Sequence, residues 1–213
     1  MNINPYAKRI LFFGDSLTYG RIPNWKRYII TKRFTWVIQE ILWNDYEVIE
    51  EWLRWRTLYW ENKCFFGRQW NTQFWPILWS HLPIDLLVIM LWTNDANNYN
   101  DIYDEQQIYS CLDEYRDQIQ WRCESIWVSQ LPQLLLISPP NIGKDYEWIL
   151  FQGAQPKIQI IQKSMKSYAN IHNIQFIESA NYIQPSEIDW VHLDEQNNKI
   201  LWTIIAQKIK EIL

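Results

Sequence analysis

Glycine is scarce in this chain. It accounts for 5 of 213 residues, whereas an average protein contains roughly 7% glycine. Tryptophan, usually the rarest residue, occurs 15 times. The two frequencies look exchanged, and no ordinary hydrophobic core requires so many indole side chains. The positions of the tryptophans along the chain are therefore more informative than their number.

Other features are also sparse. The three cysteines, Cys64, Cys111 and Cys123, have no metal-ligand spacing and predict a reduced, cytoplasmic chain. The longest apolar run, residues 84–92, is too short to cross a bilayer, and residues 1–9 are too polar for a secretory signal. The 20 basic and 24 acidic residues give a net charge of −4, without a basic run. We therefore expect neither a membrane nor a nucleic acid as a partner.

Short apolar runs alternate with helix-period stretches along the chain. The apolar runs predict strands at residues 9–13, 46–50, 86–91, 134–138 and 174–177. The periodic stretches predict helices at residues 34–42, 73–81, 104–120, 155–169 and 194–213. This order predicts a single α/β domain over residues 1–213. We expect a three-layer α/β/α sandwich with a flavodoxin-like parallel sheet of about five strands.

Candidate catalytic side chains follow the predicted strands, where ligands of parallel sheets bind. Ser16 lies on a tight turn after the first strand and is a candidate nucleophile. His192 is a candidate base, and Asp189 could hold its tautomer. Asn94, after the third strand, carries an amide that can donate to an oxyanion. Taken singly, these residues also fit simpler roles, because Gly-Asp-Ser is a common turn and Asp or Ser often caps a helix.

In combination, the same residues resemble the motifs of the SGNH (GDSL) hydrolases. The three matching blocks are Gly14-Asp15-Ser16-Leu17, Asn94-Asp95 and the Asp-x-x-His of Asp189 to His192. Further blocks resemble the branch of arylesterases and perhydrolase-type acyltransferases; among them are Phe34-Thr35, Arg56-Thr57 and Ser138-Pro139-Pro140. The resemblance covers nearly the whole chain. The G-x-S-x-G elbow of the α/β-hydrolases is absent.

The resemblance implies a serine esterase that cleaves small, acetyl-type esters, with acyl transfer to alcohols as a further activity. It assigns Ser16 as nucleophile, His192 as base and Asp189 as the partner of the base. The implied oxyanion hole combines the backbone N–H groups of Ser16 and Trp55 with the Asn94 amide. Further pocket candidates are Asp15, Leu17, Arg54, Trp92, Pro140 and Val191. No metal or organic cofactor is implied, and the assembly stays open because relatives include oligomers.

Many tryptophans stand where the family pattern has glycine. The clearest positions are Trp36, Trp43, Trp52, Trp55, Trp92, Trp190 and Trp202; Trp25 and Trp70 follow, and then Trp60, Trp75, Trp79, Trp121, Trp127 and Trp148. Trp43 also lies between a predicted helix and Asn44, where a left-handed cap is usually glycine. We hypothesise that UGA codons, read as glycine in the source cell, have been translated as tryptophan.

Two other interpretations of the tryptophans remain. If they are genuine, Trp92 and Trp190 would crowd the loops of the site and leave a catalytically impaired protein. Exposed tryptophans could instead form a carbohydrate-binding module, since aromatic rings stack on sugars. Arg54 is a separate departure from the family pattern. Its side chain either lies at the rim of the acyl pocket or points into solvent.

Overall fold

The computed structural model describes residues 4–23, 26–59, 61–62, 65–100, 104–128, 130–143 and 149–213. The strands are β1 (Lys8–Gly14), β2 (Tyr46–Trp52), β3 (Leu86–Met90), β4 (Gln133–Ile137) and β5 (Gln175–Ile177). The α-helices are α1 (Ser16–Tyr19), α2 (Phe34–Leu42), α3 (Phe74–His81), α4 (Glu105–Ser125), α5 (Ala154–His172) and α6 (Glu195–Ile212).

The five strands form one parallel sheet in the order β2-β1-β3-β4-β5. This is the flavodoxin-like order, in which the order of the strands across the sheet reverses between β1 and β3. The register brings the end of β1 beside its neighbours, since Gly14 pairs with Trp52 on β2 and with Met90 on β3. The loops that follow these three strands therefore start side by side.

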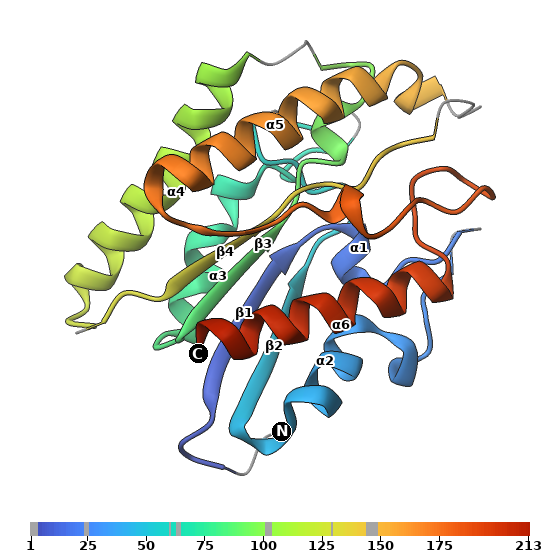
Figure 1. Ribbon diagram of the computed structural model, residues 1–213. Helices are drawn as coiled ribbons and strands as arrows, with labels where there is room; N and C mark the ends of the chain where they lie inside the picture. The colour runs from blue at the N-terminus through green and yellow to red at the C-terminus, as the bar shows by residue number, and fades with distance from the viewer. Residues whose placement is uncertain are drawn as a thin grey trace.

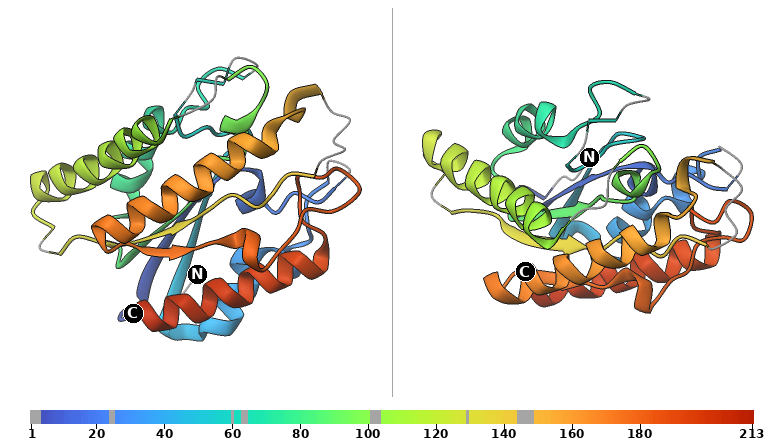
Figure 2. Two further views of the ribbon diagram at one scale, coloured as in Figure 1. Left: turned by 45° about the horizontal axis from the view of Figure 1, so that its top comes forward. Right: turned by 90° about the horizontal axis from the view of Figure 1, so that it is seen from above.

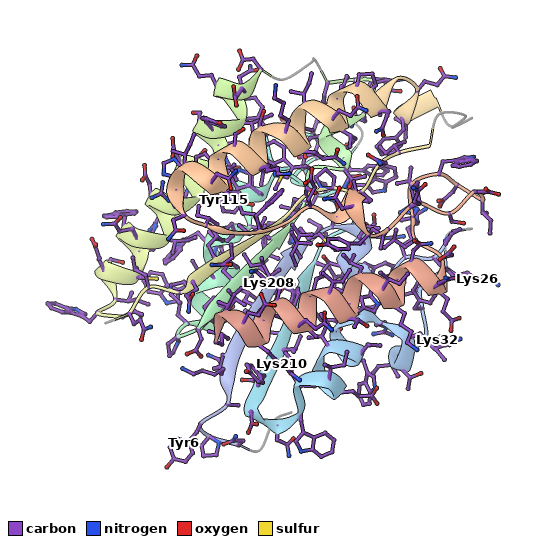
Figure 3. All side chains as sticks on the ribbon, viewed as in Figure 1. Tyr6, Lys26, Lys32, Tyr115, Lys208 and Lys210 are labelled. Carbon is purple, nitrogen blue, oxygen red and sulfur yellow. The ribbon has the colours of Figure 1, made fainter. Side chains whose placement is uncertain are left out.

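Alternate side chains of the strands enter two hydrophobic clusters, one on each face of the sheet. On one face Ile10 and Phe12 of β1 pack with residues of α2 and α6, which lie side by side (Figure 1). On the other face Leu11 and Phe13 pack with residues of α3, α4 and α5. The predicted three-layer sandwich is thus confirmed. Figure 3 shows Tyr115 of α4, which is fully buried in the second cluster.

The amino and carboxyl ends of the strands lie on opposite sides of the molecule. Tyr6, which precedes β1, projects into solvent at the amino end of the strands (Figure 3). At the opposite end, Lys32 forms an ion pair with Glu195 in the first turn of α6. The loops of that carboxyl end gather near α1 in both views of Figure 2. No helix in the part of the chain that the structure describes is long and apolar enough to span a membrane.

Candidate active site

Ser16 is held on a tight turn between β1 and α1. Asp15 caps the helix by accepting the Leu17 N–H on its side chain at 2.9 Å. At the other end, Gly20 adopts a left-handed conformation with φ of 75°. A side chain at Gly14 would collide with Thr18, because a Cβ there would lie 1.8 Å from the Thr18 hydroxyl oxygen. Glycine is thus required at the end of β1. The turn places Ser16 as the first residue of α1.

The three predicted catalytic residues form one hydrogen-bonded chain. His192 Nε2 lies 3.1 Å from Ser16 Oγ, and His192 Nδ1 lies 2.7 Å from Asp189 Oδ2. The other Asp189 oxygen accepts the backbone N–H groups of His192, at 2.9 Å, and Val191, at 3.2 Å. Because these backbone bonds fix the carboxylate, it holds the imidazole in a set orientation. Ser16 and His192 are both buried.

The electrostatic environment keeps His192 neutral near pH 7. Burial lowers the pKa of His192 below 6.5, the bond to Asp189 opposes this, and the nearby Arg21 charge lowers the pKa further. Burial alone would raise the pKa of Asp189, but its bonds with His192 and with the backbone outweigh this and lower it. The pair is therefore a neutral imidazole beside a carboxylate, and such an imidazole can accept a proton.

Asn94 begins a short 3-10 helix, Asn94–Ala96, four residues after the end of β3. Its side-chain nitrogen donates to the Arg56 carbonyl at 3.0 Å and to Asp15 Oδ2 at a longer 3.3 Å. The next residue, Asp95, accepts the backbone N–H groups of Leu58 and Tyr59. The Asp95 carboxylate thus ties the loop after β2 to the loop after β3, which agrees with a positioning role rather than acid–base chemistry.

The buried side chain of Arg56 stabilises the strand ends next to the site. Its guanidinium donates to the carbonyls of Gly14, at 2.7 Å, and Glu51, at 3.0 Å, and lies 3.9 Å from the centre of the Phe13 ring. Burial lowers the pKa of Arg56 to about 10, so it remains a cation at neutral pH. This buried cation joins the ends of β1 and β2 beneath the site.

Ser16, His192 and Asn94 line one small cavity together with Trp55 and Val191. The remaining lining residues, Arg21 and Phe151, were missed by sequence reasoning. Arg21 gave a weak signal, since it directly follows the Ser16 turn. Phe151 gave no such signal, because it does not lie next to the end of any predicted strand. The cavity volume is about 10 Å³, which is room for roughly one water molecule.

Several predicted pocket residues lie outside this lining. Leu17 packs in the cluster beneath α2 and α6, and Trp92 is buried in the cluster on the other face of the sheet. Pro140 is also buried. Arg54 is exposed, with its guanidinium 5.5 Å from the Tyr19 ring centre. Within the described residues, no group of three or more His, Cys, Asp or Glu side chains could hold a metal ion.

The burial of Asp15 predicts a pH-dependent stability. Burial raises the pKa of Asp15 from 3.8 to about 7, so between these values the folded chain retains a proton that the unfolded chain releases. The free energy of unfolding must then fall as the pH rises through this window. The full cost, on the order of 4 kcal/mol, is present only above about pH 7.

The variant Asp15→Asn removes this titration but keeps an oxygen that can accept the Leu17 N–H. His192 acts in the opposite direction, because its lowered pKa makes the folded state bind fewer protons. Both chains contain His192, so its contribution cancels in the comparison. Urea denaturation at pH 5 and pH 8 should show the variant gaining stability over the wild type at the higher pH. An equal difference at both pH values would contradict the prediction.

Several solved structures share this architecture. The aryl esterase of M. smegmatis matches with a TM-score of 0.88 and 29% identity, over 97% of this chain and 100% of that chain. The carbohydrate acetylesterase Est24 of Sinorhizobium meliloti matches with 0.87 and 28%, again over 97% and 100%. A lipolytic G-D-S-L family member from Veillonella parvula shares the fold, with a TM-score of 0.65 and 17% identity over 97% and 98%. No protein-family model and no curated protein matches the chain.

Proposed function

Since this chain belongs to the SGNH (GDSL) hydrolases and is a carboxylic ester hydrolase, we propose that it cleaves small, short-acyl esters through an acyl-serine intermediate on Ser16. The observation that carries the proposal is the continuous chain of hydrogen bonds from Asp189 through His192 to Ser16. A nucleophile bonded to a neutral base, with the base oriented by a carboxylate, is the arrangement that nucleophilic acyl transfer needs.

In the first half of the reaction, Ser16 Oγ attacks the ester carbonyl carbon while His192 Nε2 accepts the hydroxyl proton. The carbonyl oxygen becomes an oxyanion, which binds the backbone N–H groups of Ser16 and Trp55 and the Asn94 amide. The long 3.3 Å contact between Asn94 and Asp15 is the one that the oxyanion replaces. The intermediate then collapses, and the departing alcohol takes the proton from His192.

In the second half, a water molecule gives a proton to His192 and attacks the acyl carbon. Collapse of the second tetrahedral intermediate releases the carboxylic acid and returns the proton to Ser16. An alcohol that takes the place of water yields a new ester instead, which is acyl transfer. An acetyl-sized acyl group is consistent with the carbohydrate acetylesterase among the structural neighbours.

The test is hydrolysis of p-nitrophenyl esters of increasing acyl length, with Ser16→Ala as the blank. We expect hydrolysis of the acetyl ester that is lost in the variant, and an acetyl group on the peptide containing Ser16 after rapid acid quench. Added methanol should divert part of the product to methyl acetate. Hydrolysis that persists in Ser16→Ala, or cleavage restricted to long-chain esters, would overturn the proposal.

The exposed tryptophans give little support to the alternative of a carbohydrate-binding module. Trp36, Trp79 and Trp121 lie on three different helices, α2, α3 and α4, and Trp43 and Trp127 follow the ends of α2 and α4. Trp79 and Trp121 are linked, since Trp75 packs edge-on against Trp79 and the Arg122 guanidinium lies over both Trp75 and Trp121. A sugar platform needs rings that share one flat face, which this edge-on packing does not provide. A folded chain that binds acetylated sugars but hydrolyses no ester would reverse this preference.

A further inference from the structure

Apart from glycine, most of the described residues with a positive φ are tryptophan. Among the described residues, six other than glycine have a positive φ. One of them is Asn173 at the end of α5, a residue type that tolerates this conformation. The other five are Trp43, Trp55, Trp92, Trp127 and Trp190, with φ between 54° and 88°.

Tryptophan is among the least suitable residues for such positions. A Cβ in the left-handed conformation approaches the following carbonyl oxygen, which destabilises every residue except glycine, and bulky residues occur there only as outliers. Glycine adopts the conformation at no steric cost. The five positions lie on five separate segments, so one unusual loop cannot account for them. What they share is a backbone geometry that requires glycine.

The positions also include three that adjoin the catalytic residues. Trp190 lies between Asp189 and His192, and Trp92 is two residues before Asn94. Trp55 lines the cavity at Ser16. In each case the strained residue belongs to a loop that must place a catalytic group accurately.

The Trp55 indole packs beside the cavity at Ser16. It stacks on Phe65, with ring centres 5.2 Å apart, and on Phe151 at 6.4 Å. With this indole in place, the cavity beside Ser16 holds about one water molecule. Without it, an apolar hollow bounded by Phe65 and Phe151 would open toward the nucleophile. Its apolar walls suit a short acyl chain.

We infer that residues 43, 55, 92, 127 and 190 of the natural protein are glycine, encoded by UGA codons that its cell reads as glycine, and that the space of the Trp55 indole is the acyl-binding pocket. The second part rests on the proposed ester hydrolysis, whereas the first part stands independently of it. The first part accounts for five of the 15 tryptophans and so for part of the exchanged frequencies. The second part explains why an otherwise complete site has so little room.

The first part is tested by codons and by mass. UGA at all five positions supports the inference, and UGG at any of them overturns it there. Mass spectrometry of peptides from the protein purified from its source cells should show, at each position, the mass of a glycine residue in place of tryptophan. Peptides with tryptophan at these positions would refute the inference.

A stability test separates left-handed positions from ordinary ones. Trp43 and Trp127 are exposed and have a positive φ, whereas Trp121 is also exposed but lies within α4. Trp43→Gly and Trp127→Gly should each raise the midpoint of thermal unfolding by about 2–4 °C or more. Trp121→Gly should lower it, because glycine weakens a helix interior. A lowered midpoint in all three variants would contradict the inference.

Ester hydrolysis by variants tests whether the space of the Trp55 indole is the acyl-binding pocket. Trp55→Gly should raise kcat/KM for p-nitrophenyl acetate about ten-fold or more by relieving overpacking, and should extend hydrolysis to propionyl and butyryl esters. Trp43→Gly, far from the site, should leave the chain-length preference unchanged. Ser16-dependent hydrolysis that does not respond to Trp55→Gly would overturn the pocket assignment alone. If neither chain hydrolyses any ester, the proposed function fails with it, while the codon and stability results still decide the glycine assignment.

Discussion

Replacement of Asp189 by asparagine should lower kcat by about 10⁴-fold, with the protein still folded. The reason is the way the carboxylate is held. One oxygen of Asp189 accepts the backbone N–H groups of Val191 and His192, and the other faces His192 Nδ1. In the variant, the amide oxygen must take the two backbone bonds, so the NH₂ group faces the imidazole. Nδ1 then becomes an acceptor, and the ring proton moves to Nε2, which faces Ser16 and can no longer act as a base.

Asp194→Asn is a matched control for this change. Asp194 lies five residues further along, and its side chain accepts the Asn197 N–H at the start of α6. Asparagine caps a helix as well as aspartate does, so this variant should keep both its stability and its activity. Burst and steady-state kinetics on p-nitrophenyl acetate would measure the effect. Asp189→Asn with more than about a tenth of the wild-type kcat would show that the carboxylate does not set the tautomer.

Replacement of Asn94 by alanine should lower kcat by about 10²–10³-fold and change KM little. The Asn94 amide lines the cavity with Ser16 and His192, and its donors are needed only when negative charge develops on the substrate oxygen. An interaction present mainly in the transition state changes kcat rather than KM. A loss seen in KM alone would contradict an oxyanion role.

Two further variants distinguish the loss of the amide donor from a change in the loop. Asn94 also donates to the Arg56 carbonyl, so alanine could loosen the loop as well as remove a donor. Asn94→Asp keeps the shape but has no amide donor, and it should lose at least as much activity. Asn98→Ala changes an exposed amide in the same loop and should leave the rate unchanged. Thermal unfolding of all three variants identifies any effect that comes from stability.

The fold was predictable because the strands are short, apolar and separated by periodic helices. Each predicted strand agrees with β1 to β5 within two residues at either end. The helix α4 extends five residues past its predicted end, to Ser125, because the apolar period fades there while the backbone bonds continue. The helix α1 was not predicted, since four residues are too few to show a helical period.

The positions of the proposed catalytic residues were predictable for a topological reason. Ser16 and Asn94 lie within four residues of the ends of β1 and β3, and the carboxyl ends of parallel strands meet at one edge. Phe151 could not be found in this way, because its contact with the cavity depends on how a loop folds back. The sequence also could not decide the orientation of Arg54, which the structure places in solvent.

The backbone geometry supports the hypothesis that tryptophan replaces glycine at some of the predicted positions and not at others. Of the seven clearest positions, Trp43, Trp55, Trp92 and Trp190 have left-handed geometry, whereas Trp36, Trp52 and Trp202 do not. Trp25, Trp60 and Trp148 lie outside the described residues. A need for glycine also arises where another chain segment approaches closely, which φ does not reveal. Trp202 fits that case, as it is buried against Phe34 with no hydrogen-bond partner for its indole N–H among the described residues.

The bond between Ser16 and His192 joins residues 176 positions apart in the chain. A ribosome that has made β1 to β5 has therefore not yet delivered the base, and α6 follows the base and still has to cover β1. Contacts of such long range close late in folding, after local structure has formed. The nascent polypeptide should consequently be inert toward esters throughout its synthesis. The regain of hydrolysis during refolding would then report the final docking step, later than any spectroscopic signal from the helices.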